Sequence, residues 1–578
     1  MSCDFLPTPE QKAIVEWNGS AFVTACPGAG KTRVLVERAR HLLKARGLRG
    51  GIAFLSFTEV AVSELDERLR KEKLLLPPTM PSFVGTFDSF LWRFLITPFG
   101  IPGSDVKPRL IPDLDSREVV PYPKARALPL KVFDRVSGVA DAKALQRERL
   151  TTNDVGQHQA AALRMWTRFR TRGEIDYTDA RTIALSRLRS PDTSQALAKA
   201  LGARFAELIV DEAQDCNPDD LEIINWFRKI GMPVKVICDP HQSIYGFRGG
   251  VTNELTAFAE TFPKQERLSM TGNFRSSRAI VHAVSCLKRH DGSGPTDEAL
   301  GRYRNETLPL HLLFYPGSSV PKSVGEYFRA LVDQLDAKPE DCPIVAATRT
   351  SGARALGIAI ADDSEHLACR LAAAVGAFHA SFDRGGRKEA LEELHKIILR
   401  IEGHLPNKSY RQHMVELGDA NLTWRPSVLA LGQQLRYDPA VYASADMWLA
   451  KAQTLLASKL PKGGGRTIAQ VLRNDATLKN LLSVPPSHGF SARTIHSVKG
   501  AEFPAVCLVI SPATAKSTFD FLEVGSPSDA AEELRKVYVG ASRAQRLLAI
   551  AAPNSQRKRL TKIFTNGATP NMLAIVQL

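Results

Sequence analysis

Residues 25–32 combine glycine, lysine and threonine in the spacing of a phosphate-binding loop. They read Ala-Cys-Pro-Gly-Ala-Gly-Lys-Thr and lie between the apolar run 21–24 and a helix-like run at 33–43. Glycines let backbone N–H groups curl around phosphate oxygens, and the N-terminus of a following helix adds a positive dipole. In such a loop Lys31 reaches the β- and γ-phosphates and the Thr32 hydroxyl binds Mg²⁺.

The alternative for this segment is a glycine-rich turn with a surface lysine, but the flanking strand and helix patterns favour the phosphate loop. We therefore expect the chain to bind a nucleoside triphosphate. The residues expected to surround its phosphates are Cys26, Pro27, Gly28, Ala29, Gly30, Lys31, Thr32 and Arg33.

A pair of carboxylates, Asp211 and Glu212, follows the strand-like run 207–210. A carboxylate at a strand end opposite a phosphate loop suits Mg²⁺ coordination, which we assign to Asp211. The adjacent Glu212 can polarise the attacking water. The alternative is an acidic helix N-cap, where the helix dipole stabilises a carboxylate. The upstream phosphate loop favours the metal and catalytic interpretation, because the two motifs predict each other.

Short apolar runs that end at polar residues recur along the chain, and they predict the elements that position these groups. The runs are 52–55, 208–210, 234–238, 344–347 and 506–510, with helical patterns such as 60–70 and 220–228 between them. Such runs are typical of parallel strands buried on both faces. The order predicts an α/β fold with functional residues at the carboxyl ends of strands. Two mainly helical stretches, roughly 95–170 and 352–490, are expected to be insertions.

The composition of the chain limits the classes of protein to which it can belong. The chain has 578 residues, which suggests about three or four domains. Its formal charge of +15 favours a polyanionic partner such as nucleic acid, although many soluble proteins are basic. The eight cysteines form no CxxC pair, so we expect buried thiols in a reducing compartment. No apolar run reaches membrane-spanning length and no signal peptide is evident, so we expect a cytoplasmic protein.

Seven further segments resemble family motifs. They are Leu-Pro-Thr-Pro-Glu-Gln at 6–11, Ser-Phe-Thr at 56–58, Gly-Thr-Phe-Asp-Ser-Phe at 85–90, Asp-Pro-His-Gln-Ser-Ile-Tyr-Gly-Phe-Arg-Gly at 239–249, Asn-Phe-Arg-Ser at 273–276, Thr-Ile-His-Ser-Val-Lys-Gly-Ala-Glu-Phe at 494–503 and Val-Tyr-Val-Gly-Ala-Ser-Arg-Ala at 537–544. Together with the phosphate loop and Asp211–Glu212, they resemble the superfamily 1 DNA helicases of the UvrD/Rep/PcrA group, in the expected order over most of the chain.

This resemblance implies two RecA-like P-loop NTPase cores with parallel sheets, each carrying a mainly helical insertion. We expect residues 1–94 and 171–270 to form the first, ATP-binding core, and 95–170 its insertion. Residues 271–351 and 491–578 should form the second core, with a reduced insertion at 352–490. ATP would then bind in the cleft between the cores. The cleft would close when ATP binds, and hydrolysis would release the closed state.

The resemblance also implies roles around ATP. Gln11 reads the adenine edge, Phe274 stacks on adenine and Glu502 contacts the ribose. Gln242 senses the γ-phosphate and couples hydrolysis to DNA grip, and Arg275 contacts the γ-phosphate. Arg543 is the expected arginine finger, since a guanidinium fork suits charge developing on transferring phosphoryl oxygens.

On the DNA side, the resemblance implies contacts from Phe57, Thr58, Thr86, Phe87, Tyr245, Phe247, Arg248 and His496. Phe247 is a base-stacking candidate, and such stacking contributes about 1–3 kcal/mol per base. The alternative for Tyr245 and Phe247 is core packing. Two positions depart from the family: Glu59–Val60 replace its usual Asn-Lys, and Asp88 replaces a histidine. An acid facing a phosphate backbone would repel it, so Asp88 either points away or marks altered DNA handling.

The predicted function is an ATP-dependent DNA helicase or translocase that uses ATP and Mg²⁺ on single-stranded and tailed duplex DNA. By resemblance it moves 3′ to 5′ and acts in repair, replication or phage defence. Its compact organisation, with no room for a C-terminal nuclease, is similar to the helicase subunits of phage-defence systems such as Gabija. The alternative is a DNA-end-sensing ATPase subunit that regulates a partner nuclease with little unwinding of its own. An RNA-directed ATPase is a third, less favoured hypothesis.

Overall fold

The computed structural model describes most of the chain. The described residues are 6–44, 50–75, 79–112, 114–122, 125–148, 152–244, 252–288, 296–357, 366–384, 387–405, 410–417, 423–461, 466–475, 478–482, 489–569 and 571–578. The chain divides into two compact units. The first comprises Met1–Pro108, Tyr177–Leu356 and Phe490–Leu578, and the second comprises Arg109–Asp176 and Gly357–Gly489.

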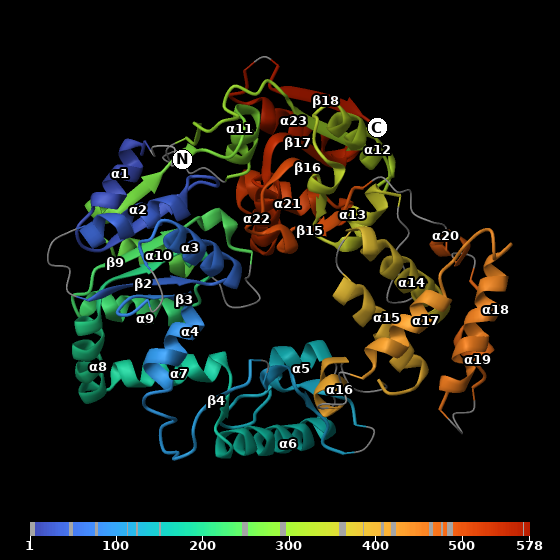
Figure 1. The fold of residues 1–578 in the computed structure, drawn as a ribbon, viewed down its shortest axis with the longest axis horizontal. Helices are drawn as coiled ribbons and strands as arrows, with labels where there is room; N and C mark the ends of the chain where they lie inside the picture. Colours follow the sequence, from blue (N-terminus) through green and yellow to red (C-terminus); the bar gives the residue numbers. More distant parts are fainter. Residues whose placement is uncertain are drawn as a thin grey trace. The chain divides into compact units, whose positions relative to one another are not determined.

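The first unit contains two six-stranded parallel sheets (Figure 1). The first sheet has the order β10-β1-β9-β8-β2-β3, and every neighbouring pair is parallel. Its strands are β1 (Ala21–Ala25), β2 (Gly51–Ser56), β3 (Phe83–Thr86), β8 (Phe205–Val210), β9 (Val234–Cys238) and β10 (Arg267–Met270). All residues of β2 and β9 are buried, as expected for apolar strands covered on both faces.

Helices pack around this first sheet and against one another. They include α1 (Pro9–Glu16), α2 (Lys31–Lys44), α3 (Glu59–Lys71), α4 (Phe87–Leu91), α7 (Tyr177–Arg189), α8 (Pro191–Arg204), α9 (Pro218–Lys229) and α10 (Thr252–Glu260). Helix α2 buries Val34, Leu35 and Ala39 in one apolar cluster with Val23 of β1 and Phe54 of β2. This packing fixes the start of α2 against the end of β1, where the phosphate loop lies.

The second sheet has the order β15-β14-β16-β17-β13-β18 and is also parallel throughout. Its strands are β13 (Leu310–Tyr315), β14 (Ile344–Ala346), β15 (Ala492–Thr494), β16 (Phe503–Val509), β17 (Ala544–Pro553) and β18 (Leu573–Gln577). The surrounding helices are α11 (Arg278–Cys286), α12 (Ser323–Asp333), α13 (Arg349–Ala355), α21 (Pro512–Val524), α22 (Ala531–Ala541) and α23 (Arg557–Thr565). A short parallel pair, β11 (Gly272–Asn273) and β12 (Glu298–Ala299), follows β10.

These two sheets confirm the predicted α/β class, and each predicted apolar run coincides with a strand. Residues 52–55, 208–210 and 234–238 lie in β2, β8 and β9, and the later runs overlap β14 and β16. The predicted helical patterns 60–70 and 220–228 lie in α3 and α9. Of the described cysteines, Cys26, Cys216, Cys238, Cys342, Cys369 and Cys507 are buried as expected, whereas Cys286 is only partly buried. Across the described residues we find no helix with the length and apolarity needed to cross a membrane.

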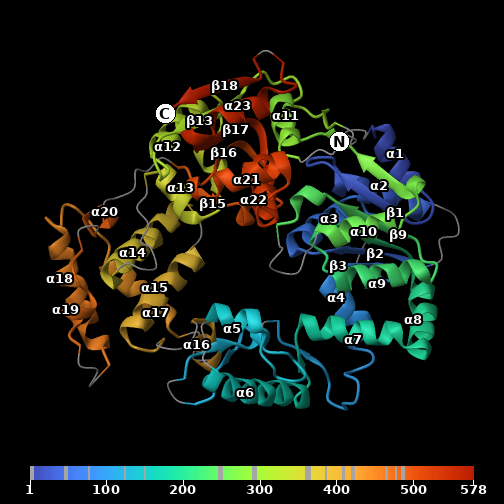
Figure 2. The same cartoon turned by 180° about the vertical axis from the view of Figure 1, so that it is seen from behind.

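The second unit is built from two chain segments (Figure 2). Residues 109–176 contain the helices α5 (Ala142–Glu148) and α6 (Thr152–Thr171) with two short strand pairs, β4 (Arg109–Leu110) with β7 (Glu174–Ile175) and β5 (Glu118–Val119) with β6 (Leu128–Pro129). The later segment is helical, with α14 (Leu367–Arg384), α15 (Arg387–Ile401), α16 (Tyr410–Leu417), α17 (Arg425–Gln434), α18 (Ala445–Leu456), α19 (Ile468–Val471) and α20 (Leu478–Leu482). Trp448 is fully buried in the apolar core of this helical segment.

Candidate functional site

The phosphate loop connects the carboxyl end of β1 to the N-terminus of α2. Gly28 and Gly30 have φ angles of +71° and +78°, in the left-handed region where a side chain is strained. A Cβ at Gly28 would also lie 2.6 Å from the Arg275 Cβ. The loop packs directly against the segment after β11, since the Phe274 N–H donates to the Gly28 carbonyl at 2.8 Å. Residues far apart in the chain therefore meet at the phosphate loop.

The predicted catalytic pair lies at the carboxyl end of β8, on the same edge of the sheet as the phosphate loop. Lys31 Nζ lies 2.6 Å from Glu212 Oε1, and both side chains are largely buried. Burial lowers the pKa of Lys31, but the nearby carboxylates Glu212 and Asp211 outweigh it and the pKa is raised. Burial raises the pKa of Glu212, but Lys31 outweighs it and that pKa is lowered. The two groups therefore form a charged pair.

Glu212 is held in an unusual backbone conformation. Its φ and ψ are +56° and +36°, in the left-handed region that non-glycine residues rarely occupy. It precedes the 3-10 helix η4 (Ala213–Asp215), and Gln214 Nε2 donates to its carboxylate. Gln214 Oε1 in turn accepts from the Asp239 N–H at 3.1 Å. Such conformations persist only where surrounding contacts hold them, and they cluster at functional sites.

The residues that could hold Mg²⁺ are few. Burial raises the pKa of Asp211 despite the opposing charge of Lys31, so this carboxylate would gain from a nearby cation. Among the described residues there is no group of three or more His, Cys, Asp or Glu suited to a metal ion. Mg²⁺ commonly uses one or two protein ligands together with substrate phosphates and water. The Asp211 carboxylate and the Thr32 hydroxyl fit that pattern.

Arg543 of the second sheet's domain contacts Gln242 of the first sheet's domain. Both residues are predicted to act at the γ-phosphate. Arg543 is buried, and its Nη2 donates to Gln242 Oε1 at 2.6 Å. Burial, helped by the charge of Arg275, lowers the pKa of Arg543 to about 10. Gln242 Nε2 donates to Asp239 Oδ2 at 2.7 Å, and the Tyr538 hydroxyl donates to the same oxygen at 3.2 Å. Gln242 and Arg543 thus belong to one buried polar network.

Arg275 and Glu502 lie next to this network. Arg275 Nη2 lies 2.7 Å from Glu502 Oε1, and Arg275 Nη1 donates to the Ser542 carbonyl at 2.9 Å. Burial raises the pKa of Glu502, but Arg275 outweighs it, so that pKa is lowered. Phe274 is 36% exposed, so its stacking on adenine stays a prediction that the exposure of this residue allows.

Gln11 occupies a structural position beside the phosphate loop. Its Nε2 donates to the Ala29 carbonyl at 3.0 Å, and its Oε1 accepts from the Thr8 N–H at 3.0 Å. Thr8 Oγ1 accepts from the Gln11 N–H, so the two residues form the capping box of α1. The side chain therefore ties α1 to the loop, and its reading of adenine remains a prediction.

The predicted DNA-side residues of the first sheet lie at its carboxyl edge. The rings of Phe57 and Phe87 stack with centroids 5.4 Å apart and planes 13° apart. Phe87 is 1% exposed, so Phe57 is the ring of this pair that a base could reach. Thr58 and Thr86 are the N-caps of α3 and α4, and their hydroxyls accept from backbone N–H groups.

His496 lies where the second sheet's domain meets the segment that follows Gln242. Its Nε2 is 3.2 Å from the Ile244 carbonyl oxygen. The three other predicted DNA contacts, Tyr245, Phe247 and Arg248, directly follow this segment but lie outside the described residues.

Asp88 faces a cation of its own domain. Its Oδ1 lies 2.7 Å from Arg181 Nη2, and Arg181 Nε donates to Asp220 Oδ1 at 2.7 Å. Asp220 is 1% exposed. We expected Asp88 either to point away from DNA or to mark altered DNA handling. The structure shows the Asp88 carboxylate paired with Arg181, which compensates most of its charge.

Several residues of the site had no predicted role. Lys499 Nζ donates to both carboxylate oxygens of Asp215, at 2.8 and 2.6 Å. Gln214 links Glu212 with Asp239, and the Tyr538 hydroxyl donates to Asp239, as described above. Lys499 and Tyr538 lie inside the motif-like segments 494–503 and 537–544, and Gln214 and Asp215 closely follow the predicted pair Asp211–Glu212. A sequence pattern, however, does not say which side chains meet.

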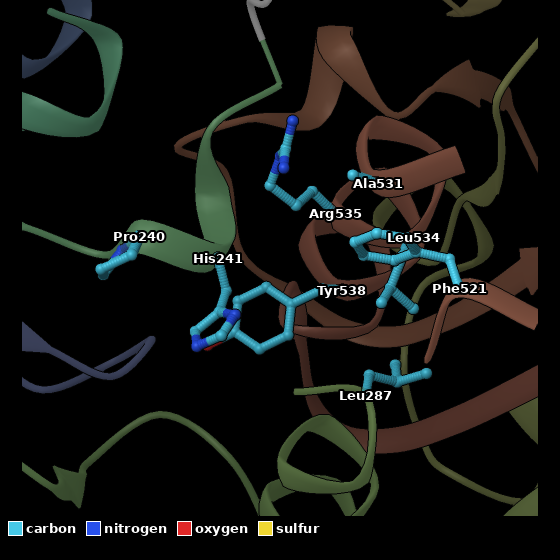
Figure 3. Close-up of a pocket in the computed structure, with 8 residues that line it drawn as sticks. All are labelled: Pro240, His241, Leu287, Phe521, Ala531, Leu534, Arg535 and Tyr538. Atoms are coloured by element: carbon cyan, nitrogen blue, oxygen red, sulfur yellow. The ribbon is translucent and has the colours of Figure 1, made fainter. Parts of the chain in front are cut away.

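A small hollow lies beside Tyr538, which is one of the residues that line it (Figure 3). Its volume is about 150 Å³. The rings of His241 and Tyr538 lie beside each other at its edge, with centroids 5.4 Å apart. It is lined by Pro240, His241, Leu287, Phe521, Ala531, Leu534, Arg535 and Tyr538. No phosphate-loop residue is among them, so this hollow is distinct from the candidate nucleotide site.

Comparison with known proteins gives consistent matches. Residues 7–263 match the family described as "UvrD/REP helicase N-terminal domain", and residues 465–555 match the "UvrD-like helicase C-terminal domain". The "Putative ATP-dependent DNA helicase YjcD" of Bacillus subtilis is 24% identical over 96% of this chain and 79% of its own length. The "ATP-dependent DNA helicase PcrA" of Staphylococcus epidermidis is 24% identical over 49% of this chain and 40% of its own length. The "ATP-dependent DNA helicase PcrA" of Staphylococcus aureus is 24% identical over 48% of this chain and 39% of its own length.

Proposed function

The chain belongs to the UvrD/PcrA-like superfamily 1 DNA helicases, and from this premise we propose that it is an ATP-driven translocase on single-stranded DNA. We propose that it moves 3′ to 5′ and couples hydrolysis to the unwinding of tailed duplexes in repair, replication or phage defence. The proposed division places residues 1–94 and 171–270 in the first core and residues 271–351 and 491–578 in the second, with insertions at 95–170 and 352–490.

One observation carries this proposal: the residues proposed to form the ATP site come from both proposed cores and contact one another. Gly28 contacts the Phe274–Arg275 segment, and Arg543 hydrogen-bonds Gln242. A site assembled from two cores can respond to nucleotide by opening or closing, because γ-phosphate contacts stabilise only the arrangement in which both halves touch it. That coupling is what a motor requires and what a simple nucleotide-binding domain lacks.

The proposed hydrolysis starts from the Lys31–Glu212 pair. Arriving phosphates replace Glu212 as the partner of Lys31, which frees the carboxylate to orient the attacking water and accept its proton. Asp211 and Thr32 would hold Mg²⁺, which supplies charge neutralisation on the β- and γ-phosphates. Arg543 would then exchange its bond to Gln242 for the transferring phosphoryl oxygens.

The link to DNA runs through the chain after Gln242. The carbonyl of Ile244, two residues on, contacts His496 of the second core. A change in the hydrogen bonds of Gln242 therefore reaches the segment that leads to Tyr245 and Phe247. This short path supports the proposal that hydrolysis changes the grip on DNA.

The test is steady-state ATP turnover of the purified chain alone and with single-stranded DNA, duplex DNA or RNA, followed by unwinding of 3′-tailed and 5′-tailed duplexes. We expect strong stimulation by single-stranded DNA and unwinding of the 3′-tailed substrate, both absent in Lys31→Ala. Equal stimulation by RNA and DNA, or unwinding only from a 5′ tail, would contradict the proposal.

A second candidate is a DNA-end-sensing ATPase with little unwinding of its own. The Asp88–Arg181–Asp220 cluster favours it, because two carboxylates and one guanidinium leave no net positive charge for a phosphate at a position expected to face DNA. Turnover activated by duplex ends, without strand separation in the same preparation, would support this candidate.

A further inference from the structure

One ion pair joins the two cores at the turn that carries the catalytic carboxylate. Lys499 follows the 3-10 helix η11 (His496–Val498), and Asp215 is the last residue of η4, three positions after Glu212. The ammonium donates to both oxygens of the carboxylate, at 2.8 and 2.6 Å. The two side chains are 8% and 5% exposed.

This pair differs in kind from a surface salt bridge. Exposed pairs contribute little because water screens them, whereas a buried charge that loses its partner is strongly unfavourable. Burial raises the pKa of Asp215 to about 6 even though Lys499 lowers it. The carboxylate therefore depends on the ammonium of the opposite core.

The turn beside Asp215 needs external support. Glu212 has left-handed backbone angles and no side-chain cap hydrogen bond, so the turn needs contacts beyond its own Asp215 N–H to Glu212 carbonyl bond to keep this conformation. The contacts described above that hold it are Lys31 to Glu212, Gln214 to Glu212 and Asp239, and Lys499 to Asp215. Of these, the contact from Lys499 alone originates in the second core.

We propose that Lys499 is a positioning residue for ATP hydrolysis: it fixes the turn bearing Glu212 only while the two cores touch. Turnover is then conditional on contact between the cores, since separation releases Asp215 and lets Glu212 leave its productive geometry. The inference rests on the proposed function in that Glu212 orients the attacking water. Lys499 itself touches no reacting atom.

The first test separates catalysis from nucleotide binding. A misplacement of a catalytic group by about 1 Å lowers turnover roughly 100-fold, so Lys499→Met should lower the DNA-stimulated kcat by about 10- to 100-fold. The KM for ATP should change by less than about threefold, since the phosphate loop is untouched. Lys499→Arg should restore most of the turnover, because it keeps the charge and can bond both oxygens.

A double variant excludes the effect of an orphaned charge. In Lys499→Met the Asp215 carboxylate is left buried and unpaired, and Asp215→Asn removes that charge. If positioning is the role, the double variant stays as slow as Lys499→Met alone. Recovery of turnover in the double variant would overturn the proposal. The matched control is Lys536→Gln, which also removes one positive charge from the second core but breaks only pairs within α22.

A second measurement does not depend on ATP turnover. Backbone hydrogen exchange of residues 211–217 reports the bonds of the turn, such as the Asp215 N–H to the Glu212 carbonyl at 3.0 Å. Exchange there should rise in Lys499→Met and stay at the wild-type level in Lys536→Gln. Unchanged exchange in Lys499→Met would refute the positioning role. Absence of DNA-stimulated turnover in the unmodified chain would refute the proposed function instead.

Discussion

Gly28 is the position where the packing of the phosphate loop can be tested most directly. A Cβ there would lie 2.6 Å from the Arg275 Cβ, 3.0 Å from Asn273 Oδ1 and 3.2 Å from the Arg275 N. Its φ of +71° adds backbone strain for any side chain. Gly28→Ala therefore combines two effects, a strained backbone and a collision with the segment that holds Phe274 and Arg275.

A matched glycine separates these effects. Gly19 has a φ of +96° and no atom within 4 Å of its ideal Cβ, so Gly19→Ala should cost only the backbone strain, about 1–2 kcal/mol. Gly28→Ala should cost about 1–3 kcal/mol more, as overpacking does in a filled site. A difference of 1 kcal/mol shifts the melting midpoint of a domain of about 200 residues by roughly 2–4 °C.

The collision should also reach the chemistry. To regain ordinary contact, which begins at 3.4 Å, Arg275 must move by close to 1 Å, a displacement that lowers turnover by roughly 10- to 100-fold. The assay pairs thermal unfolding with DNA-stimulated ATP turnover for both alanine variants. If Gly28→Ala melts and turns over like Gly19→Ala, the loop does not pack on the Arg275 segment as described, and the two-core ATP site loses its main support.

Three further predictions concern other charged groups. Glu212→Gln should keep nucleotide binding, measured with a fluorescent analogue, and lose turnover, because the amide accepts no proton; loss of binding would indicate a structural role. Arg181→Met should destabilise the first unit by about 3–5 kcal/mol, because it leaves the buried Asp220 carboxylate unpaired; urea unfolding measures this, and a change below about 1 kcal/mol would exclude a buried network there. Burial lowers the pKa of His395 to about 4. The His395 ring stacks on Trp424, with the ring centroids 3.9 Å apart. Since the unfolded chain binds the proton more tightly, stability should fall as the pH drops from 6.5 toward 4, by about 2 kcal/mol at pH 5, and His395→Gln should lose this component of the pH dependence.

The α/β class was readable from the sequence because buried parallel strands are short, apolar and followed by polar residues. The runs before Asp211 and Asp239 became β8 and β9. The boundaries of helices and strands in the insertions were harder to predict from the sequence, because these segments pack against parts of the chain that are distant in sequence. The stretch 95–170 was expected to be mainly helical, but the segment 109–176 of the second unit also contains the strand pairs β4–β7 and β5–β6.

The candidate site, too, was predictable from the sequence only in part. Local patterns predicted the phosphate loop, because glycine at left-handed φ and a lysine at a helix start depend on neighbours in the chain. They also identified Asp211 and Glu212 at the end of an apolar run. They could not reveal that Asp88 pairs with Arg181, since a motif position names a residue type and not its partner.

The sequence alone therefore determined the chemistry available to this protein: a phosphate loop, a carboxylate pair and arginines suited to phosphoryl groups, spaced along an α/β chain. Tertiary structure alone decided which of these groups meet. Lys499 lies 284 residues from Asp215, and Arg543 lies 301 residues from Gln242, yet each pair is in hydrogen-bond contact. The physical reason is that charge and hydrogen bonding act over a few ångströms, so their partners are set by how two separate sheets bring their edges together.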